Sequence, residues 1–306
     1  MRTFSARVLR AITRRYPLNT PRASILCLLP EIPPGYGPFH GKRGDRYVSY
    51  GNDADVCQSL FWFGDFEPWV ITTIRRLARP GSVGLDIGAN IGAVALTLGK
   101  AVGPQGRVFC FEPMPSNIIH LKRNIAANAL HWVEVEPLAL SNSHKQVRMI
   151  LPKGHAGMSR IISLEENSSL VSRTTPDHWR LANPSSVGPE NTFVVNCTTF
   201  DQWLSERGRL DISVCKIDVE GHEFEVFAGM QRALSDRVIS AFLFERHIAH
   251  ANRNDPLFDL LTSKGYRILR VEKGLSSVHY VDLCSPLKAR PTQDFVALLP
   301  QSQMLL

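Results

Sequence analysis

The stretch "VGLDIGANIGAVALTLG" (residues 83–99) decides the fold of this chain. It begins as an apolar, strand-like run that includes Asp86, turns through Gly88 and Gly92, and continues as small apolar residues typical of a buried helix. In doubly wound α/β sheets, ligands bind where the parallel strands end, and the helix that follows offers unpaired N–H groups there. The stretch therefore predicts a ligand site with an acidic residue beside it.

The sequence on either side continues the same alternation of strands and helices. "RVFCFE" (residues 107–112) is the second strand, and residues 93–102 form the crossover helix before it. We expect further strands at residues 133–140, 212–218, 240–245, 266–271 and 294–300, and further helices at residues 118–125, 199–206, 223–234 and 257–263. The last two strands lack a strong helix between them, which predicts an antiparallel edge pair. The expected fold class is α/β, a doubly wound and mostly parallel sheet in a single domain.

This domain is expected to occupy residues 64–300, with a helix at residues 68–77 near its start. Residues 1–63 are interpreted as a basic N-terminal extension followed by a lid segment rich in Pro and Gly, and residues 301–306 as a tail.

An insert at residues 151–191 breaks the alternation, because it shows little periodicity and contains four prolines. Loops this long in a compact domain are usually functional or disordered. We expect the insert and the lid segment to cover a substrate site, with Trp179 and Phe66 as aromatic walls.

The net charge of +7 is unevenly distributed, since residues 1–30 carry six arginines and no Asp or Glu. One interpretation is an amphipathic helix through Phe4, Val8, Leu9 and Ile12 that makes weak contact with an anionic membrane surface or acts as an organellar address. The other is a frayed basic terminus. Elsewhere the charges are interspersed, without a basic aromatic motif or zinc-finger spacing, so nucleic-acid binding is not expected.

The composition is that of a globular protein, with 44% hydrophobic and 21% charged residues. No apolar run reaches the length of about 18 residues that a transmembrane helix needs. The six cysteines are scattered and form no C-x-x-C pair. These features predict a protein of the reducing cytoplasm.

The glycine turn favours a nucleoside over a dinucleotide. A G-x-G-x-x-G fingerprint would place its middle glycine where this chain has Asn90, and that glycine lets the backbone approach a pyrophosphate. Glu112 ends the second strand, where its carboxylate can accept hydrogen bonds from both ribose hydroxyls of an adenosine. A nucleoside without a pyrophosphate therefore fits this site better than NAD.

Four motifs resemble those of the FkbM-type methyltransferases, a branch of the class I S-adenosylmethionine-dependent enzymes. They are "GLDIGANIG" (residues 84–92), "FEPMPSN" (residues 111–117), "LKRN" (residues 121–124) and "KIDVEGHE" (residues 216–223). The resemblance extends roughly from "GDFEPW" at Gly64 to Pro300 and implies a seven-stranded sheet. It also implies S-adenosylmethionine as cofactor and a small-molecule or glycan acceptor, methylated on a hydroxyl of a sugar, glycolipid or polyketide-like compound.

The resemblance further implies which residues bind the cofactor. The residues expected around its methionine part are Asp86, Gly88, Asn90 and Gly92. Glu112 is expected to hold the ribose. Asn117, Ala139 and Ser141 are expected near the adenine or the ribose.

Asp218 is the first candidate for the general base or acceptor-orienting group, followed by Glu245 and His247. Alternatively, Asp218, Glu220 and Glu245 could hold a Mg²⁺ ion that lowers the pKa of the acceptor hydroxyl. Asp218 could instead cap the helix that follows it, and Glu245 could pair with Arg246.

Two other functions remain open at this point. A nicotinamide-dependent Rossmann oxidoreductase is disfavoured by Asn90 and by the absence of a Tyr-x-x-x-Lys pattern. A non-catalytic nucleoside-binding module would keep the cofactor pocket but lack a path for an acceptor to Asp218. His222, in the last motif, is interpreted as a surface residue.

Overall fold

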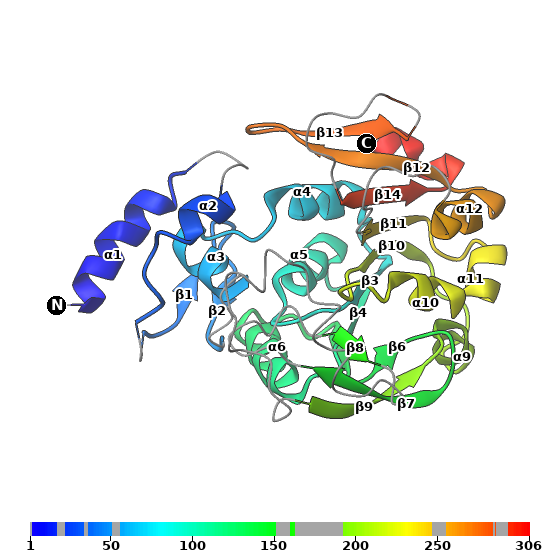
Figure 1. Ribbon diagram of the computed structural model, residues 1–306, viewed down its shortest axis with the longest axis horizontal. Helices are drawn as coiled ribbons and strands as arrows, with labels where there is room; N and C mark the ends of the chain where they lie inside the picture. Colours follow the sequence, from blue (N-terminus) through cyan, green and yellow to red (C-terminus); the bar gives the residue numbers. More distant parts are fainter. Residues whose placement is uncertain are drawn as a thin grey trace.

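The fold is given by a computed structural model, which is shown in Figure 1. It describes residues 2–16, 22–33, 36–50, 56–150, 160–162, 192–246, 255–283, 285 and 293–306. The predicted insert lies almost entirely outside these residues, as do Trp179 and His247.

A central sheet of eight described strands runs in the order β13-β12-β14-β11-β10-β3-β4-β5. The strands are β3 (Val83–Ile87), β4 (Arg107–Phe111), β5 (Val133–Glu136), β10 (Ile212–Ile217), β11 (Ala241–Glu245), β12 (Arg267–Lys273), β13 (Val278–Asp282) and β14 (Asp294–Leu298). Five neighbouring strands of this sheet, β11, β10, β3, β4 and β5, are mutually parallel. β14 lies between β11 and β12 and is antiparallel to both. The predicted α/β class, parallel centre and antiparallel pair of β12 and β14 are confirmed.

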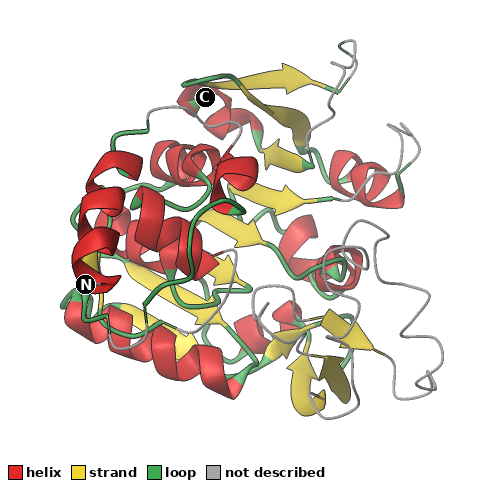
Figure 2. Ribbon diagram, turned by 60° about the vertical axis from the view of Figure 1, so that its left-hand side comes forward, coloured by secondary structure: helices red, strands yellow, loops and turns green. Residues whose placement is uncertain are grey.

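Helices cover both faces of this sheet, as Figure 2 shows. They are α4 (Pro68–Leu77), α5 (Ala93–Val102) and α6 (Pro115–Ala127) on one face, and α9 (Phe200–Ser205), α10 (Glu223–Ala228), α11 (Gln231–Ser235) and α12 (Pro256–Ser263) on the other. Alternate strand residues serve the two cores: in β4, Val108 and Cys110 pack on the first side, and Phe109 and Phe111 on the second. This double covering explains why the central strands read as continuous apolar runs.

The sheet has one strand more than the seven expected. β13 forms a hairpin with β12, closed by a turn in which the Gly274 N–H donates to the Ser277 carbonyl. Its residues are exposed or only partly buried, so its sequence carries little apolar signal. β13 therefore adds an outer edge without changing the predicted core.

The third strand predicted within residues 133–140 is confirmed as β5, and the residues after Glu136 are its exit, because the chain leaves the central sheet there. Pro137 follows β5 and has no N–H to donate to a continuing ladder. The next strand, β6 (Ala139–Leu140), belongs to a separate sheet of order β6-β9-β7-β8. The other members of that sheet are β7 (Lys145–Ile150), β8 (Arg160–Ile162) and β9 (Thr192–Thr198).

The helix predicted at residues 223–234 is also wrong as one element, since α10 and α11 are separated by Gly229 and Met230. A Cβ atom added at Gly229 would lie only 2.1 Å from the Ser141 carbonyl oxygen. The close approach of β6 to this helix end therefore requires glycine.

The N-terminal segment extends one of the two cores. Its elements are α1 (Arg2–Thr13), α2 (Arg22–Leu26), β1 (Phe39–His40), β2 (Arg46–Tyr47) and α3 (Val56–Phe63), and a short 3₁₀ helix (Pro300–Leu305) ends the chain. Phe39, Tyr47 and Phe61 join the core cluster that α4 and α5 form. α1 is helical and contacts the domain, so the frayed-terminus interpretation is wrong for these residues. No helix in the described part of the chain is long and apolar enough to span a membrane.

Asn124 fixes this segment to the sheet domain. Its fully buried side chain on α6 accepts hydrogen bonds from the N–H groups of Val48 and Ser49, and donates to the carbonyls of Ser49 and Ile91. One amide thus joins the N-terminal segment to the loop that follows β3.

We expect Asn124→Ala to lower the free energy of unfolding by about 3 kcal/mol, because it leaves several buried backbone groups without partners. Chemical denaturation measures this change. Asn196→Ala is the matched control, since Asn196 is exposed and its amide bonds only the exposed Gln146. An equal and small effect in both variants would show that Asn124 does not hold the segment.

Candidate functional site

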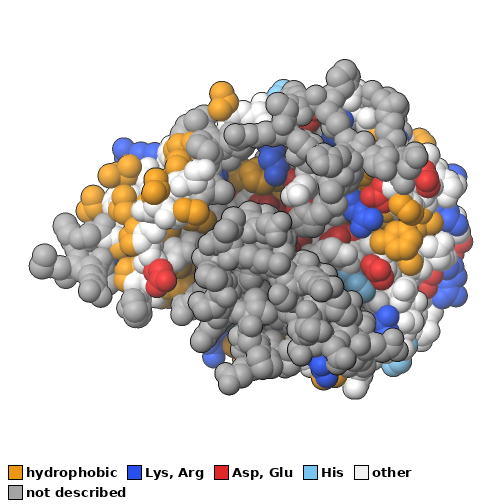
Figure 3. Space-filling model, in the orientation of Figure 1, with side chains coloured by type: hydrophobic (Ala, Val, Ile, Leu, Met, Phe, Trp, Pro, Cys, Tyr) orange, Lys and Arg blue, Asp and Glu red, His pale blue; other side chains and the backbone are white. Residues whose placement is uncertain are grey.

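A pocket of about 310 Å³ lies where β3, β4, β10 and β11 end, which is the position predicted from the glycine turn. Figure 3 shows it as a hollow in the molecular surface, with acidic side chains gathered around it. Its walls include Phe66, Glu67, Asp86, Gly88, Asn90, Phe111, Glu112, Asn117, Leu138, Ala139, Met149, Lys216, Asp218, Glu220, His222 and Glu245.

The glycine turn brings backbone to the pocket floor. Gly88 has φ of +83°, and a Cβ atom there would lie 1.9 Å from the carbonyl oxygen of Asp218. Only glycine allows the two loops to approach so closely. The turn continues through Asn90, at φ of +48°, to Gly92, the N-cap of α5.

Buried oxygens without a hydrogen-bond partner among the described residues lie at this turn. They are both carboxylate oxygens of the fully buried Asp86, which has Lys216 Nζ at 3.8 Å, and Oδ1 of the half-buried Asn90. Buried polar groups of this kind are rare unless a ligand satisfies them. The turn therefore has free acceptors for a ligand that carries N–H or O–H groups.

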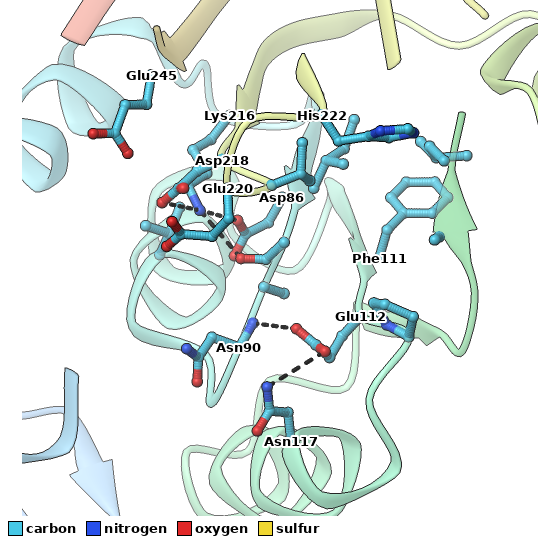
Figure 4. A pocket seen from close by; sticks show the side chains of 18 of the residues that line it. Asp86, Asn90, Phe111, Glu112, Asn117, Lys216, Asp218, Glu220, His222 and Glu245 are labelled. Atoms are coloured by element: carbon cyan, nitrogen blue, oxygen red, sulfur yellow. Dashed lines mark hydrogen bonds and ion pairs between the residues drawn. The ribbon is translucent and has the colours of Figure 1, made fainter. Parts of the chain in front are cut away.

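Glu112 is held in place by three donors, of which Figure 4 shows Asn90 and Asn117. The N–H of Asn90 donates to its Oε2 at 2.8 Å, the N–H of Met114 donates to its Oε1 at 2.9 Å, and Nδ2 of Asn117 lies 3.4 Å from Oε1. Burial raises the pKa of Glu112 to about 7, although these hydrogen bonds oppose the shift. Oε1 already accepts two of these hydrogen bonds and Oε2 accepts one, so a lone pair of Oε2 stays free to accept a ribose hydroxyl.

Lys216 forms the centre of a second polar group, as Figure 4 shows. Its Nζ lies 3.2 Å from Oδ2 of Asp218, 3.8 Å from Oδ1 of Asp86, and donates to the Gly88 carbonyl at 3.1 Å. Burial alone lowers the pKa of Lys216, but Asp218 and Asp86 outweigh it and raise the pKa above its ordinary value. Burial raises the pKa of Asp86 to about 6, and Lys216 opposes that shift. Lys216 is therefore a fixed cation between two acids.

Three more carboxyl groups share the side of the pocket where Asp218 lies. They are Glu67 before α4, Glu220 after β10 and Glu245 at the end of β11. Burial, reinforced by the charge of Asp218 and other acids, raises the pKa to about 8 for Glu67 and Glu220 and to about 10 for Glu245. This side of the pocket therefore binds protons readily and favours cationic or hydroxyl-bearing ligands.

Asp218 does not cap the helix that follows it. The N-cap of α10 is His222, and Glu223 Oε1 accepts hydrogen bonds from the N–H groups of Val219 and Gly221. The cap alternative for Asp218 is therefore wrong, and its carboxylate, with its side chain 26% exposed, faces the pocket.

His222 is not a surface residue, because its side chain is only 15% exposed and lines the pocket. Its Nε2 lies 3.0 Å from Oγ of Ser141. Burial lowers the pKa of His222, although Glu225 opposes the shift. His222 is thus a mainly neutral polar group beside the second sheet.

The structure brings eight predicted site residues to the pocket wall and leaves two behind it. Those on the wall are Asp86, Gly88, Asn90, Glu112, Asn117, Ala139, Asp218 and Glu245. Gly92 starts α5 behind the turn, and Ser141 reaches the pocket only through His222. Phe66 lies on the wall as expected.

Sequence reasoning missed Lys216, Glu67 and the role of His222. Lys216 lies between Cys215 and Ile217 in the fully buried strand β10. A charged residue inside an apolar strand is a signal in the sequence that could have identified Lys216 as a site residue. Glu67 lies within "GDFEPW", where the resemblance begins, but that motif indicates only the start of the domain.

No group of three His, Cys, Asp or Glu side chains in the described ranges has an arrangement that could hold a metal ion. The arrangement of Asp218, Glu220 and Glu245, which all lie within those ranges, therefore gives no support to the magnesium alternative.

Residues 86–268 match the model of the methyltransferase FkbM domain, which spans the glycine turn, the Lys216 group and the strands between them. The chain belongs to this family. It has the α/β fold of class I methyltransferases, and the family implies S-adenosylmethionine as the methyl donor. This membership removes the nicotinamide oxidoreductase alternative.

Three curated proteins are similar to this chain. It is 28% identical over 209 residues to the AMB antimetabolite synthetase AmbE of Pseudomonas aeruginosa, a match that covers 62% of the chain and 10% of AmbE. It is 27% identical over 197 residues to the 2-O-methyltransferase NoeI of Sinorhizobium fredii, covering 62% of the chain and 77% of NoeI. It is 29% identical over 155 residues to the methyltransferase sdnD of Sordaria araneosa, covering 48% and 59%. The chain thus spans only a tenth of AmbE and less than two thirds of sdnD.

Solved structures with a similar fold include an S-adenosylmethionine-dependent O-methyltransferase from Thermotoga maritima, at 11% identity and a TM-score of 0.39, covering 86% of this chain and 77% of that one. Another is precorrin-6y C5,15-methyltransferase from Geobacter metallireducens, at 13% identity and a TM-score of 0.38, covering 76% and 88%.

The raised pKa values predict an unusual dependence of stability on pH. A carboxyl group whose pKa is higher in the folded than in the unfolded state binds more protons when folded, so its contribution to stability is full below its unfolded pKa and is lost as the pH rises through its folded pKa. For Glu245 that window extends from about 4.5 to about 10. We expect the melting temperature of the ligand-free protein to fall as the pH rises from about 6 to 9.

Glu245→Gln imitates the protonated acid and should raise the melting temperature at the alkaline end while leaving it unchanged near pH 5. Glu206→Gln, on the exposed end of α9, is the matched control and should behave like the wild type at every pH. A constant difference between Glu245→Gln and wild type across the pH range would show that Glu245 does not titrate in this window.

Proposed function

We propose that this chain transfers the methyl group of S-adenosylmethionine to a hydroxyl oxygen of a sugar, glycolipid or polyketide-like small molecule. The observation that carries the proposal is the continuity of one pocket, which holds an adenosine-sized site around Glu112 at one side and a carboxylate group around Asp218 at the other. The printed function of the relative NoeI, a 2-O-methyltransferase, supports an oxygen acceptor.

The residues of the first side suit the cofactor. Glu112 accepts a hydrogen bond from a ribose hydroxyl, and the unpaired oxygens of Asp86 and Asn90 accept hydrogen bonds from the amino-acid part. Phe111 and Leu138 offer apolar surface for the adenine. When bound, the cofactor would supply a methyl group activated by its positive sulfonium, with the neutral thioether as the leaving group.

The residues of the second side handle the acceptor. Asp218 accepts the proton of the acceptor hydroxyl while the oxygen of that hydroxyl forms a bond to the methyl carbon. Lys216 keeps the Asp218 carboxylate oriented toward the pocket. Because Lys216 also binds the Gly88 carbonyl, the base and the cofactor loop keep a fixed separation. Lys216 is therefore a positioning residue that acts through Asp218.

Glu112→Ala is expected to weaken binding of S-adenosylmethionine and of its demethylated product by about 10- to 100-fold, because hydrogen bonds to a charged acceptor are worth about 1.5–3 kcal/mol each. Titration calorimetry measures the affinity, and thermal unfolding checks that the variant is folded. Glu136→Ala is the matched control, since Glu136 ends the neighbouring strand and pairs with Arg207 away from the pocket. A folded Glu112→Ala protein with wild-type affinity would contradict the cofactor site.

Asp218→Asn is expected to reduce turnover by at least about 100-fold while changing cofactor affinity little, because the amide keeps the shape of the side chain but cannot accept the proton. An acceptor is first found by screening sugars, glycolipids and hydroxylated natural products for transfer of a labelled methyl group. Asp211→Asn, an exposed aspartate before β10, is the control.

Three outcomes would redirect the assignment. Near-wild-type turnover of Asp218→Asn on a true acceptor would move the base to Glu245 or His247. Loss of wild-type turnover in EDTA would favour the magnesium-assisted version over a side-chain base. Cofactor binding without transfer to any acceptor class in the screen would favour the non-catalytic nucleoside-binding module.

A further inference from the structure

The inner face of α1 contacts the protein largely through polar side chains. Arg10 Nε donates to the Phe61 carbonyl at 2.6 Å, and its Nη2 donates to the His40 carbonyl at 2.7 Å. The hydroxyl of Thr13 donates to the carbonyl of Trp62, and Ala6 packs beside them, 5% exposed. Polar residues such as Arg10 and Thr13 ordinarily lie on the face of a helix that is exposed to water, but here they lie on the face that contacts the protein.

The outer face of α1 is apolar at its centre. Val8 and Ile12 lie one helical turn apart and are 49% and 64% exposed. Ala11 is exposed between them, and the exposed Arg7 and Arg15 flank this stripe. α1 lies at the left end of the molecule in Figure 1, and Figure 3 shows hydrophobic side chains gathered at the same end.

The inner face of this helix thus combines Arg10 and Thr13 with Ala6 and with Leu9, which packs on the core, while its outer face is apolar. The exposed Val8 and Ile12 belong to no core cluster of the described residues, and the Arg10 contacts hold α1 so that it presents them. Residues 1–30 contain six arginines and no acid. An apolar stripe between arginines matches the surface of an anionic bilayer.

We propose that the outer face of α1, formed by Arg7, Val8, Ala11, Ile12 and Arg15, docks on anionic lipid membranes. The aliphatic side chains enter the boundary between headgroups and acyl chains, and the arginines contact the anionic headgroups. A nucleic acid would use the same charges but gives no partner for Val8 and Ile12, because its surface is lined by phosphates and base edges. The proposal rests on α1 alone and does not depend on the proposed methyl transfer.

The test is sedimentation of the full chain with vesicles of phosphatidylcholine, with or without roughly 30% phosphatidylserine. We expect binding to the anionic vesicles only, and weaker binding as salt screens the charges. Val8→Asp/Ile12→Asp and Arg7→Glu/Arg15→Glu should each weaken binding by about tenfold or more. All four substituted residues are exposed, so cofactor binding should stay at the wild-type level.

Matched controls separate this face from general properties of the surface. Ile119→Asp changes an exposed aliphatic residue on α6, and Lys122→Glu/Arg209→Glu changes the net charge as much as Arg7→Glu/Arg15→Glu does. Both controls should bind vesicles like the wild type. Equal loss in the control and α1 variants, or equal binding to neutral and anionic vesicles, would overturn the proposal.

Light scattering in the absence of vesicles gives a further result that would overturn it. A dimer that forms in the wild type and is lost in Val8→Asp/Ile12→Asp would show that a second copy of the chain covers the stripe instead of a membrane.

Discussion

The ion pair of Lys216 with Asp218, shared with Asp86, is the interaction on which the site depends. A buried lysine is costly unless its charge is compensated, and here two carboxylates and a backbone carbonyl surround one ammonium group. The contact joins the end of β10 to the loop after β3, which are adjacent in the sheet but far apart in sequence. The two sides of the pocket, around Asp86 and around Asp218, are therefore joined through one side chain.

The pocket keeps an excess of acid around this lysine. Three further carboxyl groups lie in this region, those of Glu67, Glu220 and Glu245. Among the described residues that line the pocket, Lys216 is the one Lys or Arg. Mutual repulsion and burial favour protonation of some of these groups, while a positive ligand favours their ionisation. The positive sulfonium of the donor is such a ligand, so the electrostatics of the pocket and the chemistry of the family agree.

The sequence predicted those parts of the fold that local periodicity specifies. α4 and α5 have the expected bounds because each combines an apolar face with a clear start, Pro68 in one case and Gly92 in the other. The second sheet was missed although Val147 and Met149 in β7 alternate with polar residues, since that short signal adjoins an aperiodic insert. In the site, Glu112 and Asp218 follow strands and could be predicted, but the contribution of Glu67 depends on how α4 packs against the sheet, which no local pattern encodes.

The contact between Gly88 and the Asp218 carbonyl has an evolutionary consequence. Any side chain at position 88 would require the backbone after β10 to move, and that movement would displace Asp218 from the pocket. The paths of the two loops are therefore coupled, although more than a hundred residues lie between them. A substitution that moves the backbone of one loop would need a compensating change in the other.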